Sequence, residues 1–128
     1  MPNPIPNDSP VVRSYRDLDA WQLAMEIVVA ANRVTRAFPG DERFGLTAQL
    51  RRAAVSIPAN IAEGRGRLGP GEFRHGVSVA RGSVAEGEAD GDIGLALEFV
   101  DARDVVELTA QLDRLSKMLF GLHRRLDA

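Results

Sequence analysis

The sequence predicts an all-α fold, an antiparallel up-down bundle of four helices. Apolar residues recur at steps of three and four along four successive segments, which is the period of an amphipathic helix. No segment shows the apolar–polar alternation of a strand, and no hairpin signal appears. The segments are joined by short connections, so neighbouring helices should run in opposite directions.

The composition is that of a globular domain. A length of 128 residues suits one domain, and an aromatic fraction of 5% suits helix packing better than sheet packing. The absence of cysteine excludes disulfides and zinc–thiolate sites, and a net charge of −2 gives no general attraction to nucleic acid or to an anionic membrane. With no apolar run long enough to span a bilayer and no signal peptide, we expect a cytoplasmic protein without a membrane partner.

The N-terminal segment differs from the rest of the chain. Residues 1–14 hold four of the seven prolines and show no apolar period. Such a segment cannot bury enough apolar surface to fold. We therefore divide the chain into a disordered N-terminal arm, residues 1–14, and a four-helix bundle domain, residues 15–128.

The first helix should begin near residues 17–19, where Asp19 and Gln22 resemble a capping box, and end before Pro39. It carries two apolar stripes, which is more apolar surface than one bundle core needs. Either the helix is buried between two neighbours or part of it forms an oligomer interface. The residues of the candidate oligomer interface are Trp21, Leu23, Ile27 and Val34.

The second helix should run from about residue 41 or 42 to residue 63. Its apolar face consists of Leu46, Leu50, Ala53, Ile57 and Ile61. Pro58 lies inside this pattern, where its missing N–H should kink the helix. Asn60 falls beside the apolar face, so we expect a structural amide whose partner is Ser83 or Glu86 of the third helix.

The third helix should begin at Pro70, with Gly69 at its cap. Its inner face consists of Phe73, Val77, Ala80 and Val84. The same phase then meets Gly87, Gly91 and Gly94, which either permit a very close helix contact or leave a soft segment.

The fourth helix has the most regular pattern. Asp101 and Asp104 give an acidic N-terminal signal. An unbroken apolar seam follows, formed by Val105, Leu108, Leu112, Leu115, Leu119, Leu122 and Leu126. A seam of this kind is typical of a bundle or a coiled coil.

Residues 46–54, Leu-Thr-Ala-Gln-Leu-Arg-Arg-Ala-Ala, and residues 56–64, Ser-Ile-Pro-Ala-Asn-Ile-Ala-Glu-Gly, together resemble a family signature. The family consists of bacterial four-helix bundle proteins first found encoded in intervening sequences of 23S ribosomal RNA genes. Flanking similarities extend the resemblance over about residues 15–122. The structural signature residues are Ser56, Pro58, Asn60, Glu63, Gly64, Ser83 and Glu86.

The resemblance implies a bundle that assembles as a homopentamer and has no established enzymatic activity. The family also includes accessory proteins of diversity-generating retroelements, which are basic barrels that bind reverse transcriptase and nucleic acid. The sequence departs from the family pattern at Gly87 and Gly91, where leucines are usual. We expect the local packing of the third helix to differ there.

The motifs that suggest catalysis lack their structural context. Residues 64–69 match the dinucleotide pattern G-x-G-x-x-G, but they follow a helix instead of a strand, so we interpret them as an interhelical turn. Glu72 and His75 have the Glu-x-x-His spacing of di-iron bundles, but the second copy that such a site needs is missing. The acidic run over residues 86–92 contains no histidine and is interpreted as a solvated face. We expect no catalytic residues, no metal site and no cofactor.

Charge is unevenly distributed along the chain. Residues 42–81 hold seven arginines and three glutamates, a net charge of +4, whereas residues 82–107 hold eight acids and one arginine, a net charge of −7. The candidate nucleic-acid-binding residues are Arg51, Arg52, Arg65, Arg67, Arg74 and Arg81. Phe73 is the one aromatic platform near them, so the alternative is that these charges pair between subunits or stay solvated.

Two functions are therefore expected. The first is a non-enzymatic oligomeric protein, a scaffold or adaptor whose main partner is itself in a homopentameric ring. The second is an accessory protein that binds RNA, DNA or a reverse transcriptase through the basic end between the second and third helices.

Overall fold

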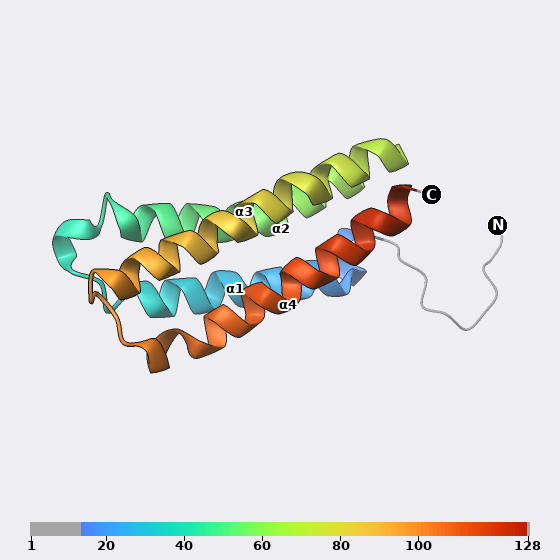
Figure 1. Ribbon diagram of the computed structural model, residues 1–128. Helices are drawn as coiled ribbons and strands as arrows, with labels where there is room; N and C mark the ends of the chain where they lie inside the picture. Colours follow the sequence, from blue (N-terminus) through green and yellow to red (C-terminus); the bar gives the residue numbers. More distant parts are fainter. Residues whose placement is uncertain (1–13, 128) are drawn as a thin grey trace.

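The computed structural model describes residues 14–127, and these residues form four α-helices and no strand. Two 3-10 turns and four helices follow in the order η1 (Tyr15–Asp17), α1 (Asp19–Thr35), η2 (Gly40–Glu42), α2 (Leu46–Gly66), α3 (Pro70–Ala96) and α4 (Ala102–Asp127). The helices lie side by side and each runs opposite to the next (Figure 1). The predicted all-α up-down bundle is confirmed for this part of the chain. The predicted arm lies, apart from Ser14, outside the described residues.

The topology brings distant parts of the chain to one end of the bundle. The α2–α3 turn, the start of α1 and the end of α4 all lie at the right-hand end of Figure 1. Helices α1 and α3 each pack against both α2 and α4, and the most extensive contact is between α2 and α3. Within residues 14–127, no helix is both long enough and apolar enough to cross a membrane.

The predicted inner faces form the core. All five predicted residues of α2 are buried, and the α4 seam is buried from Val105 to Leu119. The predicted residues of α3 are buried too, except for the half-buried Phe73. The α1 residues Leu23, Ile27 and Val34 lie in this same core. A helix that packs against both α2 and α4 accounts for the two apolar stripes of α1.

Helix α1 does not begin with the predicted capping box of Asp19 and Gln22. The capping box lies one turn earlier, where the Ser14 hydroxyl accepts a hydrogen bond from the Arg16 N–H at 3.1 Å and Asp17 accepts one from the Ser14 N–H at 3.2 Å. Gln22 instead donates to the Arg16 carbonyl at 3.0 Å. The prediction was wrong because the capping signal belongs to η1, whose end leads directly into α1.

Helix α2 begins later than predicted. Residues 40–42 form η2, and the Glu42 carboxylate accepts a hydrogen bond from the Leu46 N–H at 3.0 Å. Glu42 therefore caps α2 from outside instead of forming its first turn, because it satisfies an N–H that the helix leaves free. The helix then passes through Pro58 and continues to Gly66.

The three late glycines of α3 lie within one continuous helix. A Cβ at Gly94 would lie 2.9 Å from Cζ of Phe38, so this glycine permits a close approach of the ring. A Cβ at Gly87 would meet Leu112 at an ordinary 3.7 Å, and one at Gly91 would meet no described atom within 4 Å. The close-contact alternative therefore holds at one of the three positions.

Another glycine pair sets the distance between α2 and α3. A Cβ at Gly76 would lie 2.7 Å from the Asn60 carbonyl oxygen and 2.9 Å from Cα of Gly64. A Cβ at Gly64 would lie 3.0 Å from Cα of Gly76. Only a hydrogen atom fits at this crossing, which we call the glycine crossing. The two backbones can therefore approach more closely than side chains would allow.

Candidate functional site

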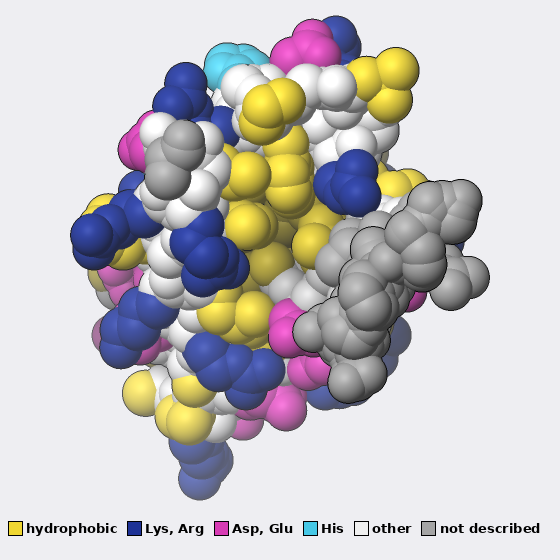
Figure 2. Space-filling view, turned by 90° about the vertical axis from the view of Figure 1, so that its right-hand side faces the viewer, with side chains coloured by type: hydrophobic (Ala, Val, Ile, Leu, Met, Phe, Trp, Pro, Cys, Tyr) yellow, Lys and Arg dark blue, Asp and Glu magenta, His cyan; other side chains and the backbone are white. Residues whose placement is uncertain are grey.

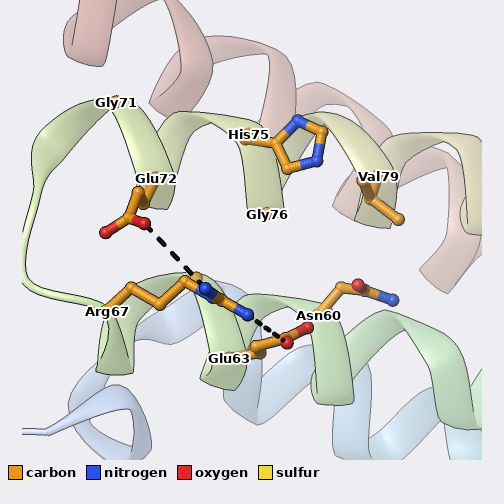
Figure 3. Close-up of a pocket in the computed structure, with 9 residues that line it drawn as sticks. Asn60, Glu63, Arg67, Gly71, Glu72, His75, Gly76 and Val79 are labelled. Atoms are coloured by element: carbon orange, nitrogen blue, oxygen red, sulfur yellow. Dashed lines mark hydrogen bonds and ion pairs between the residues drawn. The ribbon is translucent and has the colours of Figure 1, made fainter.

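A groove of about 410 Å³ lies between α2 and α3 beside the glycine crossing (Figure 3). Helix α2 contributes Asn60 and Glu63, Arg67 follows directly after the helix, and α3 contributes Glu72 and His75. The Arg67 guanidinium lies 3.0 Å from Oε2 of Glu63 and 3.9 Å from Oε1 of Glu72. The cation thus bridges the two helices at the mouth of the groove.

The charges of this groove balance one another. The hydrogen bond and the charge of Glu63, and then the charge of Glu72, raise the pKa of Arg67. All three side chains are more than half exposed, so solvent screens the pairs and they orient the side chains more than they stabilise the fold. The groove therefore presents positive and negative side chains next to each other, and not a patch of one charge.

Within residues 14–127, no three His, Asp or Glu side chains gather where they could hold a metal ion. Glu72 and His75 are one turn apart on α3, and both are exposed. Their Glu-x-x-His spacing therefore stands without the further carboxylates that a di-iron site requires.

Three signature residues form a hydrogen-bonded link between α2 and α3. The Ser56 and Ser83 hydroxyls are 2.8 Å apart. The Asn60 amide donates to the Ser56 carbonyl at 2.8 Å and to the Ser56 hydroxyl at 2.9 Å. Asn60 hydrogen-bonds within the bundle, as predicted, but its partner is Ser56 and not Ser83 or Glu86. Ser56 lies one helical turn before Asn60 and occupies the position between it and Ser83.

A second groove, of about 620 Å³, lies farther along the same two helices. Its lining includes Arg52 and Val55 of α2 and Glu86 of α3. One turn beyond Glu86, Asp90 is only 5% exposed, and its Oδ2 atom has no hydrogen-bond partner in the part of the chain described. Burial and the charge of Glu86 raise the pKa of Asp90, while Arg52 acts in the opposite direction.

The acidic run of residues 86–92 is therefore only partly the solvated face that was predicted. Glu86 and Asp92 are exposed, but Glu88 is half-buried, and burial raises its pKa, as do Asp113 and Asp92. Asp90 follows Ser83 and Gly87 along the side of α3 that is buried. The run of charges alone predicts a solvated face, but the helical spacing places Asp90 on the buried side of α3.

The six candidate arginines do not form one patch. Arg51 Nε donates to the Thr35 hydroxyl of α1 at 2.8 Å. Arg74 pairs with an aspartate at the end of α4, and the Arg81 guanidinium lies 5.1 Å from the centre of the Phe120 ring, also on α4. These three cations hold helices together, and the others lie on α2 or at its end.

The basic end includes cations that sequence reasoning missed. Because α4 runs back toward the α2–α3 turn, Arg124 and Arg125 come to the same end as Arg65 and Arg67 (Figure 1). Figure 2 views this end, where basic side chains, with acidic ones among them, lie around an apolar centre. The antiparallel topology predicted from the sequence was the signal that could have placed them there.

The predicted oligomer interface on α1 needs correction. Leu23, Ile27 and Val34 are 2%, 0% and 8% exposed, and Trp21 is half-buried against the core. Side chains inside a protomer cannot contact a second copy. The exposed apolar side chains of α1 are instead Met25 and Val29, which are 40% and 56% exposed.

Residues 16–121, from η1 through most of α4, match the model of the family described as 23S rRNA-intervening sequence protein. The chain belongs to this family. Comparison with curated proteins finds no match. In this member of the intervening-sequence protein family, the signature segment forms α2, and its Ser56 and Asn60 supply the polar link to α3.

Proposed function

We propose that this intervening-sequence family protein is a non-enzymatic assembly protein, a scaffold or adaptor that acts as a homopentameric ring in the cytoplasm. The observation that carries the proposal is the apolar surface left outside the core. Large apolar side chains that are 38–61% exposed occur on every helix: Met25, Val29, Val55, Val79, Ile93 and Val106. Contiguous exposed apolar surface marks interaction sites, and three of these residues, Val55, Val79 and Ile93, lie on the adjacent helices α2 and α3. The resemblance to pentameric bundles supports the ring.

Size-exclusion chromatography coupled to light scattering tests the proposal. One chain has a mass of 13.9 kDa, so a ring of five has a mass of about 70 kDa. A mass near five chains that persists over a range of concentrations supports the pentamer. A mass of one chain at every concentration overturns the proposal, and another stable multiple overturns the number five alone.

A second candidate function, nucleic-acid binding, is favoured by the basic end of the bundle. There the topology gathers Arg65 and Arg67 with Arg124 and Arg125, from two separate parts of the sequence. Convergent cations attract phosphates and release counterions when they bind. On this alternative the protein is an accessory factor whose partner is RNA, DNA or a reverse transcriptase.

A gel-shift titration with RNA and with DNA at two salt concentrations tests the alternative. Combined alanine substitutions at Arg124 and Arg125 should weaken binding and lower its salt dependence. Arg103→Ala, at the exposed start of α4 and the opposite end of the bundle, is the control. No binding at low salt, or equal losses in the variant and the control, would remove this function.

A further inference from the structure

The outward surface of α2 and α3 differs from that of α4. The exposed positions of these two helices carry mostly small or apolar side chains: Val55, Ala59, Val79, Gly82, Ala89 and Ile93. We call the surface that they share the outer α2/α3 face. Both helices are apolar on the side that faces the core, and their outward sides also carry apolar side chains between a few charged ones. The outward side of a helix that faces only water is normally polar.

Helix α4 shows the opposite pattern. Most of its outward positions are charged, including Arg103, Asp104, Glu107, Asp113, Arg114 and Lys117, and its large exposed apolar side chains are Val106 and Phe120. This helix has the ordinary surface of a bundle that stays in water. The contrast arises within one small domain, so it does not reflect composition alone. It points to the outer α2/α3 face as a surface with a partner.

The charges on this face argue for the kind of partner. Its two grooves contain Arg51, Arg52 and Arg67 together with Glu63, Glu72 and Glu86. Three arginines against three glutamates give no net positive charge, so the face does not suit a polyanion such as nucleic acid. Balanced charge around an apolar centre suits another protein surface that carries both signs of charge, and a chain with 16 basic and 18 acidic side chains offers such a surface on a second copy.

The dimensions of the face agree with this partner. Helix α2 has 21 residues, which corresponds to a length of about 30 Å at ~1.5 Å per residue. Two such helices side by side cover about 20 Å, so the face measures roughly 600 Å², close to the ~800 Å² per partner of a stable interface.

We propose that a second copy of this chain docks on the outer α2/α3 face. The inference rests on the proposed assembly and names the surface through which it occurs. The link from Ser56 to Ser83 and the glycine crossing hold α2 and α3 in one rigid pair. The pair can therefore present a fixed surface to the next protomer. In a ring with head-to-tail contacts, blocking this one face releases every protomer.

The test uses three matched substitutions and light scattering. Ala59→Arg on α2 and Ala89→Arg on α3 place a long cation on the face, and Ala110→Arg on the outside of α4 is the control. All three alanines are exposed and helical, and each has an acidic residue three or four positions away. Helix propensity and local pairing are therefore similar in the three variants.

We expect Ala59→Arg and Ala89→Arg to reduce the mass to that of one chain, while Ala110→Arg keeps the mass of the wild type. An assembled wild type whose mass is unchanged by both face variants overturns this inference and leaves the proposed assembly standing. A wild type with the mass of one chain overturns both. Far-UV circular dichroism identifies a variant that unfolds. If one of the two face variants unfolds, the mass of the other face variant tests the inference.

Discussion

The glycine crossing of α2 and α3 makes a sharp stability prediction for Gly76→Ala. The new methyl group would lie 2.7 Å from the Asn60 carbonyl oxygen and 2.9 Å from Cα of Gly64, whereas ordinary contact begins at 3.4 Å. Both obstacles are backbone atoms inside α2, so neither can rotate away. The helices must therefore move apart by about 0.7 Å along a closely packed interface.

Two opposing terms set the size of the effect. Overpacking of a well-packed core costs about 1–3 kcal/mol, and rigid backbone obstacles place this site at the upper end. Alanine in place of glycine returns about 1 kcal/mol through helix propensity. The expected result is a net destabilisation of about 2 kcal/mol, or roughly 8 °C in Tm for a domain of this size.

Gly91→Ala is the matched control on the same helix. A Cβ at Gly91 meets no described atom within 4 Å, so this variant should gain about 1 kcal/mol from propensity alone. Urea titrations followed by far-UV circular dichroism, at one protein concentration, measure both variants against the wild type. If Gly76→Ala proves as stable as Gly91→Ala, the glycine crossing does not limit the approach of the two helices.

Two further substitutions test the polar groups between α2 and α3. Burial and the charge of Glu86 raise the pKa of Asp90 in the folded protein, and Arg52 only partly opposes them. Above the ordinary carboxyl pKa, the folded protein therefore binds more protons than the unfolded chain. The free energy of unfolding should fall as the pH rises through this range. Asp90→Asn should therefore be about 1 kcal/mol more stable than the wild type near neutral pH and lose this advantage in acid. If the Tm difference between Asp90→Asn and the wild type is the same at neutral and acidic pH, Asp90 is not a buried carboxylate with a raised pKa. Asn60→Ala removes two hydrogen bonds to Ser56 and should cost about 1–2 kcal/mol in the same melts, so an unchanged Tm would show that the link is not structural.

Periodicity in the sequence was enough to predict the four helices and their inner faces. It could not tell how many neighbours a helix has, so it left open whether α1 is buried between two neighbours or forms an interface, and Leu23 and Ile27 lie in the core. It also misplaced the start of the second helix, because a carboxylate such as that of Glu42 can cap a helix from outside or lie in its first turn. The neighbours of a helix and the position of a capping residue both depend on the path of the backbone, which residue spacing does not reveal.

The candidate site was harder to predict than the fold. Gly76 has no distinguishing pattern in the sequence, because a close crossing depends on where a second glycine lies on another helix. Asp90 belongs to an acidic run that was predicted to be solvated. It lies seven residues after the buried Ser83, on the same side of the helix, and this spacing could have predicted its burial. The basic end required Arg124 and Arg125, which only the path of α4 brings into place.

A second copy that docks on the outer α2/α3 face must cover this face in solution. The chain has no cysteine, so Ala59→Cys and Ala110→Cys each introduce a single thiol, one on this face and one on α4. The direct measurement is the rate of maleimide labelling at protein concentrations above and below assembly. Self-association through this face predicts that Ala59→Cys reacts severalfold more slowly than Ala110→Cys in the assembled protein and at the same rate after dilution. Equal rates in the assembled protein would contradict it.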